Sequence, residues 1–250
     1  MVIYTEQDTY MDRAELLAAG LGARITRDKS DAETQDVFLL IDDEGIALAG
    51  GGLTLRADLT GMLPRIRTAN LRNELLVRAA KIRGAAGELC AVDATAGFGE
   101  DSLLLAAAGF SVRLYEYNPV TAILLEDALQ RAAQVPELSD IVSRMELVKE
   151  DSVEAMPHLP FAPDVILLDP MFPARQKSGL IRKKLQLIQK LEKPCADEET
   201  LVKAAMAARP KKIVIKRPAK GPYLAGIRPG YSIEGKVIRY DCIVPPPQSM

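Results

Sequence analysis

Apolar runs of strand length alternate with segments of helical periodicity over most of the chain after residue 88. The runs that predict buried parallel strands are residues 89–92, 112–116, 145–149, 164–169 and 212–216. Helical patterns lie between them at residues 102–108, 120–134 and 198–208. Two further runs, residues 231–237 and 238–244, predict a closing antiparallel hairpin. The pattern predicts an α/β fold with a seven-stranded, mostly parallel sheet.

The first 70 residues follow a different pattern. Residues 11–19 have helical spacing that ends at Gly20 and Gly22, and residues 37–41, 46–48 and 53–55 predict short strands. A helix at about residues 71–82 then leads into the alternating region. We expect a small N-terminal α+β subdomain over residues 1–70 and a larger domain over residues 71–250.

Composition narrows the class of protein. With 250 residues, 48% hydrophobic and 26% charged, the chain is long enough for one large α/β domain with a small extension. No apolar run approaches the ~20 residues of a membrane span. The first residues, with Glu6, Asp8 and Asp12 among them, lack the basic and apolar regions of a signal peptide. We therefore expect a cytoplasmic protein without membrane association.

Cysteine and histidine are scarce. Cys90, Cys195 and Cys242 are far apart and none belongs to a C-x-x-C pair, so the sequence indicates neither a disulfide framework nor a zinc site. His158 is the only histidine, and it lies in a predicted turn. The sequence therefore argues against a hydrolase triad and predicts no metal.

Charge is unevenly distributed along the chain. The formal net charge is −2, yet residues 171–220 contain 14 Lys or Arg and four Asp or Glu. A basic segment on an otherwise acidic protein is typical of a directed binding face for a polyanion, although solvated helix surfaces supply part of such a count.

A glycine-rich turn follows the first predicted strand of the large domain. Asp93 ends that strand, and Gly97 and Gly99 allow the backbone to approach a ligand closely at the start of the next helix. An acid at the strand end favours a ligand with a positive charge near the turn and would repel a pyrophosphate. S-adenosylmethionine (SAM) carries an ammonium and a sulfonium, so the spacing favours a methyltransferase over a dinucleotide oxidoreductase.

Acids also end the next two predicted strands. Glu116 stands about twenty residues after the glycines, where a carboxylate can accept both ribose hydroxyls of a bound adenosine. Asp151 follows the third strand and is placed to meet the adenine amine. Acids at three successive strand ends form a constellation that indicates a nucleoside-containing cofactor.

The fourth strand ends in Asp169-Pro170-Met171-Phe172. An exocyclic amine on a nucleobase is a poor nucleophile because its lone pair is delocalised into the ring. If Asp169 and a backbone carbonyl of the Pro170 turn accept its hydrogens, the lone pair is localised and directed at the sulfonium methyl. Phe172 would stack on the extruded base, a contact worth ~1–3 kcal/mol. We therefore predict that Asp169, Pro170 and Phe172 are catalytic.

Five motifs together resemble a known family. Residues 93–97 (DATAG), 116–119 (EYNP), 169–173 (DPMFP), 176–178 (QKS) and 214–218 (VIKRP) are similar to those of the ribosomal RNA small subunit methyltransferase J family. The resemblance covers about residues 86–245. It implies a class I methyltransferase, Rossmann-like fold and SAM-dependent methylation of N2 of a guanosine in 16S rRNA. The partner would be 16S rRNA or the small ribosomal subunit.

The resemblance also implies cofactor contacts, carried over by position. These are Glu100, Asp101, Glu116, Tyr117, Asp151, Ser152 and Asp169. The chain departs from the family pattern at Glu100, where Arg is usual, at Tyr117, where a charged residue is usual, and over residues 68–73. The predicted cofactor site consists of the seven residues carried over by resemblance together with Asp93, Gly97 and Gly99.

Basic residues after the catalytic turn are expected to hold RNA phosphates without reading sequence. The predicted RNA-binding residues are Arg175, Lys177, Arg182, Lys183, Lys184, Lys216 and Arg217. Three alternatives stay open from the residues alone. They are an N-methyltransferase for another nucleic-acid base, a dinucleotide-binding oxidoreductase, and a non-enzymatic RNA-binding assembly protein. The sequence does not indicate an oligomeric state.

Overall fold

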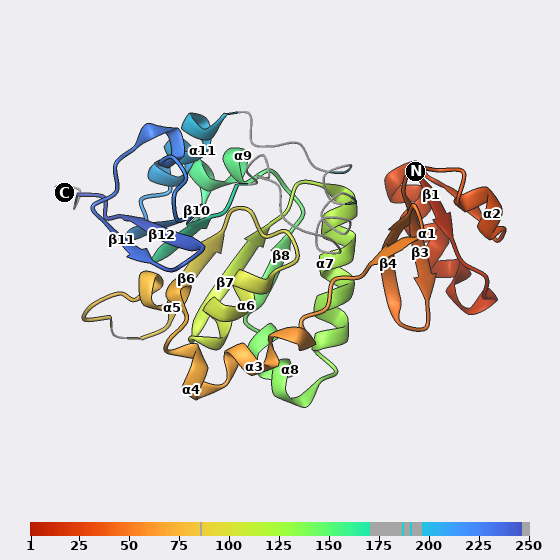
Figure 1. The fold of residues 1–250 in the computed structure, drawn as a ribbon, viewed down its shortest axis with the longest axis horizontal. Helices are drawn as coiled ribbons and strands as arrows, with labels where there is room; N and C mark the ends of the chain where they lie inside the picture. The colour runs from red at the N-terminus through yellow and green to blue at the C-terminus, as the bar shows by residue number, and fades with distance from the viewer. Residues whose placement is uncertain (86, 171–186, 188–190, 192–196, 247–250) are drawn as a thin grey trace.

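A computed structural model describes residues 1–85, 87–170, 187, 191 and 197–246. The described chain forms two separate β-sheets, of five and seven strands, and Figure 1 shows helix α7 (Pro119–Ala132) between them. The sheets span residues 2–55 and 89–243.

The N-terminal sheet has the strand order β2-β1-β3-β4-β5. Its strands are β1 (Val2–Tyr4), β2 (Arg24–Thr26), β3 (Phe38–Asp42), β4 (Gly45–Gly50) and β5 (Leu53–Leu55). β1 runs parallel to β2 and β3, whereas β3, β4 and β5 form an antiparallel meander. The predicted strands at residues 37–41, 46–48 and 53–55 are confirmed, and the three-residue strands β1 and β2 were not predicted.

Two helices accompany this sheet. They are α1 (Met11–Leu21), preceded by the 3-10 turn η1 (Asp8–Tyr10), and the short α2 (Lys29–Ala32). α1 ends where Gly22 takes a left-handed conformation with φ +60°, a backbone state that glycine adopts without a Cβ clash. The helix predicted at residues 11–19 is confirmed.

The seven-stranded sheet has the order β11-β12-β10-β9-β6-β7-β8. Its strands are β6 (Leu89–Asp93), β7 (Phe110–Tyr115), β8 (Met145–Val148), β9 (Val165–Leu168), β10 (Lys212–Pro218), β11 (Tyr231–Glu234) and β12 (Ile238–Ile243). Strands β6 to β10 are mutually parallel, and β12 pairs antiparallel with both β10 and β11. The predicted mostly parallel sheet with a closing hairpin is confirmed.

Helices cover both faces of this sheet. Side chains alternate between the faces along each strand, so the strands contribute to one core on each side. Ala91, Val165 and Val214 belong to the core beneath α5 (Leu75–Ala80), α6 (Glu100–Ala107), α7 and α8 (Pro136–Val142). Their chain neighbours Val92, Ile166, Ile213 and Ile215 face the other core, which includes α11 (Glu198–Ala207), η3 (Met156–His158) and η4 (Leu224–Gly226). The short α9 (Ser152–Ala155) lies beside α11.

The segment between the two sheets departs from the prediction. It contains η2 (Thr60–Met62), α3 (Leu63–Ile66), α4 (Thr68–Leu71) and α5. The single helix expected at residues 71–82 is wrong, because the backbone of Glu74 is extended (φ −60°, ψ 129°) and separates α4 from α5. Asn73 donates its side-chain amide back to the carbonyl of Ala69 at 3.1 Å, a local bond that competes with continuation of a helix.

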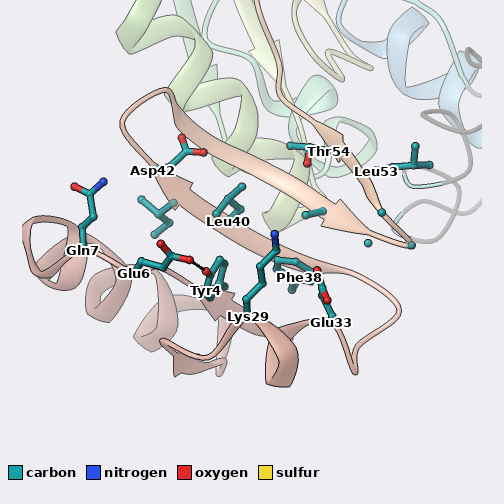
Figure 2. A pocket seen from close by; sticks show the side chains of 15 residues that line it. Tyr4, Glu6, Gln7, Lys29, Glu33, Phe38, Leu40, Asp42, Leu53 and Thr54 are labelled. Carbon is teal, nitrogen blue, oxygen red and sulfur yellow. Dashed lines mark hydrogen bonds between the residues drawn. The ribbon is translucent and has the colours of Figure 1, made fainter.

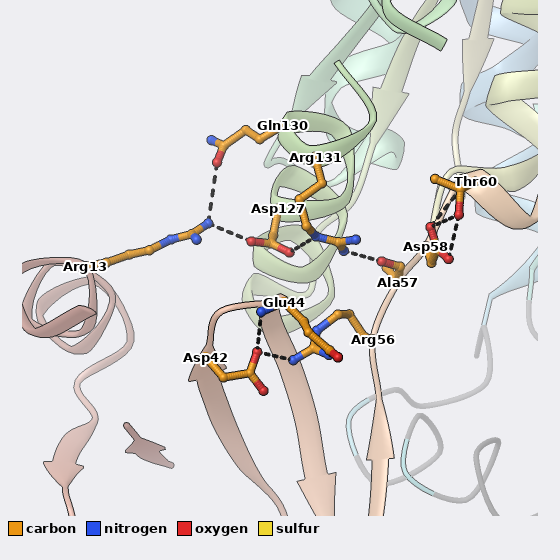
Figure 3. Close-up of polar contacts among 10 residues, drawn as sticks. All are labelled: Arg13, Asp42, Glu44, Arg56, Ala57, Asp58, Thr60, Asp127, Gln130 and Arg131. Carbon is orange, nitrogen blue, oxygen red and sulfur yellow. Dashed lines mark hydrogen bonds and ion pairs between the residues drawn. The ribbon is translucent and has the colours of Figure 1, made fainter. Parts of the chain in front are cut away.

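A buried carboxylate joins the N-terminal sheet to α7. Asp127 on α7 is 1% exposed, and it accepts from Arg13 of α1 and from Arg131 one turn further along α7, each at 2.8 Å (Figure 3). Arg131 also donates to the backbone carbonyl of Ala57. Strand β4 begins against the same group, because a Cβ at Gly45 would lie 2.6 Å from Asp127 Oδ2. The two sheets are thus tied together through one ion-pair network.

We expect Asp127→Ala to lower the free energy of unfolding by about 1–3 kcal/mol, because two arginines lose their shared acceptor while remaining partly exposed to water. Urea unfolding measures the change. The control is Asp140→Ala on α8, an exposed acid. Equal stability of the two variants would contradict the role given to Asp127.

Candidate functional site

The carboxyl ends of the parallel strands bring acids and one lysine to the same edge of the large sheet. β6 ends at Asp93, Glu116 follows β7, and Asp169 follows β9. Lys216 lies near the end of β10, beside Asp169. Ligands in open α/β sheets bind at this edge, so these residues mark the candidate site.

The glycine turn between β6 and α6 is held open by backbone geometry. Gly97 and Gly99 both have positive φ, +54° and +75°, which disfavours other residues there. A Cβ on Gly99 would lie 2.8 Å from Leu125, whereas a Cβ on Gly97 would meet no atom within 4 Å. Gly99 therefore serves close packing, and Gly97 borders open space.

Glu116 links this turn to the start of α7. Its carboxylate accepts from the backbone N–H of Gly97 at 3.1 Å and from that of Asn118 at 2.8 Å. Asn118 in turn caps α7 by accepting from the backbone N–H of Val120 and of Thr121. Glu116 is thereby fixed beside the glycine turn, at the edge where its strand ends.

Asp93 lies beneath the turn. Its side chain accepts from the Ser102 hydroxyl at 2.5 Å and from the Thr95 backbone N–H at 3.1 Å, and the residue is 2% exposed. Burial raises the pKa of Asp93 to about 7, although these two hydrogen bonds oppose the shift. The buried position gives Asp93 a direct role in shaping the turn.

Asp169 and Asp101 share the ammonium of Lys216. Lys216 Nζ lies 2.6 Å from Asp101 Oδ2 at the start of α6 and 2.9 Å from Asp169 Oδ2. The backbone N–H of Asp169 donates to Thr95 Oγ1 at 2.7 Å, which ties the end of β9 to the turn after β6. Burial raises the pKa of Asp169 and Lys216 opposes that shift. Burial lowers the pKa of Lys216, but Asp101 and Asp169 outweigh it, so the pKa is raised.

Tyr240 joins the cluster from β12, the strand on the other side of β10 from β9. It lies on β12 directly across from Lys216 in the antiparallel pairing, and it is 2% exposed. Burial first, and then the nearby carboxylates of Asp101 and Asp169, raise the pKa of its phenol. The described site therefore carries several carboxylates around one ammonium at the end of the sheet.

Comparison with known proteins identifies the family. The family model described as "Putative SAM-dependent methyltransferase" matches residues 12–245. Ribosomal RNA small subunit methyltransferase J of Thioalkalivibrio sulfidiphilus is 37% identical over 253 residues, covering 96% of each chain. The protein of the same name from Nitrosococcus oceani is 40% identical over 181 residues, covering 71% of this chain and 70% of that one. This chain belongs to the ribosomal RNA small subunit methyltransferase J family.

A solved structure agrees with this assignment. The crystal structure of a SAM-dependent methyltransferase from Neisseria gonorrhoeae matches with a TM-score of 0.77 at 28% identity, covering 99% of this chain and 97% of that one. The class I methyltransferase fold expected from the sequence is confirmed, and the protein is a SAM-dependent methyltransferase.

The residues present fit SAM. The open space beside Gly97 leaves room for a ligand against the backbone, and the surrounding carboxylates of Asp101, Glu116 and Asp169 favour a cation over a pyrophosphate. Asp151 precedes α9 and accepts from the Val153 backbone N–H at 2.8 Å, while Ser152 is buried at the first position of that helix.

Most predicted cofactor residues of the methyltransferase lie at one edge of the large sheet, but they differ in exposure. Glu100 and Tyr117 are exposed, at the start of α6 and after β7. Asp93 is close to the turn, yet its burial does not fit the predicted direct contact with the cofactor cation. Pro170, the next residue after Asp169, is buried.

The two predicted RNA-binding residues that the structure describes, Lys216 and Arg217, are both paired with carboxylates of the protein. Arg217 is 1% exposed, donates to the Pro222 carbonyl at 2.8 Å and pairs with Glu198. The prediction that Arg217 contacts RNA does not fit this burial, because the side chain points into the fold. Lys216 is engaged by two carboxylates rather than directed at a phosphate. Phe172, Arg175, Lys177, Arg182, Lys183 and Lys184 lie outside the described residues.

Sequence reasoning missed Thr95, Ser102 and Tyr240. Thr95 stands in the glycine motif, and a hydroxyl two residues beyond a strand end is a signal for a bond to the neighbouring strand. Ser102 replaces the third glycine of a dinucleotide motif, which identifies the position but not its partner. Tyr240 follows from the alternation of β12 only after the pairing with β10 is known.

A separate cavity of about 370 Å³ lies on the N-terminal sheet (Figure 2). Its lining combines Tyr4, Phe38 and Leu40 with the charged side chains of Glu6 and Lys29. Every residue that lines it falls within residues 4–54, so it is distinct from the strand-end site. The chemistry described above belongs to the large sheet.

Over the described residues, no group of three or more His, Cys, Asp or Glu is arranged to hold a metal ion. No helix among them is long and apolar enough to cross a membrane.

The raised pKa of Asp93 predicts a pH dependence of stability. In the unfolded chain an aspartate loses its proton near pH 4, whereas the folded protein keeps it until about pH 7. Ionisation is therefore costlier in the folded state, and the wild type loses stability as pH rises from about 4 to 7. We expect Asp93→Asn to remove up to about 4 kcal/mol of this loss. Urea unfolding of both proteins at pH 4.5 and 7.5 tests it, and parallel pH profiles would contradict it.

Proposed function

We propose that this methyltransferase transfers a methyl group from SAM to the exocyclic N2 amine of a guanosine in 16S rRNA. The observation that carries the proposal is the position of Asp169. Asp169 follows β9, its backbone N–H donates to Thr95 in the turn after β6, its carboxylate contacts Lys216, and a buried proline comes next. Relatives that are 37% and 40% identical carry the name of a small-subunit rRNA methyltransferase, which supports the substrate.

The cofactor site in this proposal runs along the strand ends. The glycine turn, Asp101, Glu116 and the start of α9 hold the cofactor, with Glu116 accepting the ribose hydroxyls and Asp151 meeting the adenine amine. Glu100, Tyr117 and Ser152 border the same ligand. When bound, SAM supplies an activated methyl group on a positively charged sulfur, which the carboxylates around Lys216 favour electrostatically.

Asp169 acts on the nucleophile. Its carboxylate accepts a hydrogen bond from the N2 amine, localises the lone pair on nitrogen and aims it at the methyl carbon. A carbonyl of the Pro170 turn takes the second hydrogen, and Phe172 stacks on the extruded base. The leaving group is a neutral thioether, so no general acid is required, and alignment supplies much of the rate.

RNA binding is assigned to the basic segment after the catalytic turn. Its 14 Lys or Arg against four acids in residues 171–220 favour a polyanion on an otherwise acidic chain. The RNA contacts proposed are Arg175, Lys177, Arg182, Lys183 and Lys184. The substrate is 16S rRNA, free or within the small subunit, and the corresponding compartment is the cytoplasm.

Replacement of Glu116 tests the cofactor site. Glu116→Ala removes two charge-assisted bonds to ribose, each worth ~1.5–3 kcal/mol, so SAM affinity should fall by at least about tenfold. Glu116→Gln retains an acceptor oxygen for one of the two N–H groups, of Gly97 and Asn118, and so reports loss of charge with less disturbance of the turn than Glu116→Ala. Calorimetry measures both, with the exposed neighbour Glu150→Ala as control. Unchanged affinity in a folded Glu116→Ala protein would place the ribose elsewhere, and binding of NAD instead of SAM would favour an oxidoreductase.

Replacement of Asp169 tests the chemistry. Asp169→Asn should lower kcat for methyl transfer to rRNA by about 100-fold or more, because the amide accepts the amine hydrogen poorly, while RNA affinity stays within about twofold. Labelled SAM and mapping of the modified base give the measurement. Asp164→Asn, at the opposite end of the same strand, is the control. Wild-type transfer by Asp169→Asn would exclude the role, and RNA binding by the wild type without transfer would favour an assembly protein.

A further inference from the structure

We propose that Lys216 is a positioning residue for methyl transfer, which keeps Asp169 ionised and reserves one of its oxygens for the substrate amine. This inference rests on the proposed function of Asp169 as the group that accepts the amine hydrogen. It also replaces the RNA-phosphate role that sequence reasoning gave to Lys216.

Strand register places Lys216 next to Asp169. β10 runs parallel to β9, and Ile215 pairs with Leu168, so Lys216 and Asp169 are the next residues on the two strands. Ile215 and Leu168 face the core beneath α11. Because side chains alternate, Lys216 and Asp169 both turn to the opposite face, where α6 presents Asp101.

The ammonium contacts one oxygen of each carboxylate. Lys216 Nζ lies 2.9 Å from Asp169 Oδ2 and 2.6 Å from Asp101 Oδ2. The Asp169 side chain is 35% exposed and that of Lys216 is 26% exposed, so both are partly buried and Asp169 stays accessible to a ligand. With Oδ2 bound to the lysine, Asp169 Oδ1 is the oxygen that can accept from a substrate N–H.

The cluster would be unfavourable without the lysine. Two carboxylates that converge on one point repel each other, and burial raises the pKa of Asp169 further. The charged and titratable groups that interact electrostatically with Asp169 are Asp93 of β6, Asp101 of α6, Lys216 of β10 and Tyr240 of β12, together with Arg217, which acts from the other face of β10. Of the two cations among these, Lys216 is the one within ion-pair distance of Asp169 in the described structure.

Ionisation of Asp169 matters at the transfer step. As N2 forms its bond to the methyl carbon, the carbon–sulfur electron pair leaves with sulfur as a thioether, and N2 must give up a proton. Asp169 Oδ1 accepts this proton and later passes it to water. A protonated Asp169 could not accept it, and its hydroxyl would not localise the amine lone pair.

A second ion pair on the same strands supplies a matched control. Lys211 Nζ lies 2.7 Å from Asp164 Oδ1, just before β10 and β9 begin. This pair has the same chemistry at the opposite edge of the sheet, far along the strands from the site. Lys211→Met therefore removes a lysine partner of an aspartate without touching the cluster.

The test is the pH dependence of kcat for methyl transfer to rRNA. Activity is expected to rise with pH as Asp169 ionises. Because the Lys216 ammonium favours the ionised form, loss of Lys216 raises the pKa of Asp169 and moves this rise to higher pH. In Lys216→Met the acid limb should move to higher pH by about 1–3 units, with kcat at a fixed pH on that limb reduced at least about tenfold and recovering as pH increases. Asp101→Asn removes the repelling carboxylate and should move the limb to lower pH. Lys211→Met should leave the limb in place, and Lys216→Arg should restore it.

An activity-independent measurement keeps the proposal separate from the proposed function. Carbon-13 NMR of labelled aspartate carboxyls should show the Asp169 titration moving upward in Lys216→Met and downward in Asp101→Asn. Suppose that the wild type is active. If its acid limb of kcat and its Asp169 titration then both coincide with those of Lys216→Met, the positioning role is overturned. If the wild type transfers no methyl to rRNA while the titrations shift as expected, the proposed function fails and the ionisation role of Lys216 stands.

Discussion

The strand-end site depends on the neutralisation of converging carboxylates by one lysine. The parallel register of β6, β9 and β10 brings Asp93, Asp169 and Lys216 to one edge, and α6 adds Asp101 from above. Such an accumulation of negative charge suits a cationic cofactor, yet it is costly while the ligand is absent. Lys216 lowers this cost because its single positive charge is shared by two carboxylates, and the cluster keeps an excess of negative charge.

The same need for a shared counter-charge appears where the two sheets meet. Asp127 on α7 is almost fully buried, and two arginines, Arg13 and Arg131, satisfy it from different elements. Here one acid serves two cations, whereas at the site one cation serves two acids. The Asp127 network holds α1 and the segment at Ala57 against α7, and the same helix begins at Asn118, whose backbone N–H donates to Glu116. The packing of the N-terminal sheet and the geometry of the cofactor edge are therefore connected through one helix.

Much of the large sheet could be predicted because its parallel strands are long apolar runs that end in acids or turns. β6 to β10 lie within a few residues of the predicted segments. The three-residue strands β1 and β2 carry too few positions for a period to register. They are strands because β1 pairs with β3 on one side and with β2 on the other. The break between α4 and α5 depends on Asn73 and on the ion pair of Arg65 with Glu74, which are contacts that periodicity does not reveal.

The site shows the same division at the level of single residues. The positions of Asp169, Glu116 and the glycines at strand ends could be predicted since a strand end is a local feature of the sequence. The contacts of Lys216 and Arg217 could not, because a count of positive charge treats neighbours on a strand alike. On β10 they turn to opposite faces, so Lys216 meets the carboxylate of Asp169 while Arg217 is buried against Glu198 and Pro222. A basic segment that crosses a strand therefore has to be divided by side-chain alternation before its charges are assigned to a ligand, and only the residues outside the strand retain the RNA-binding assignment.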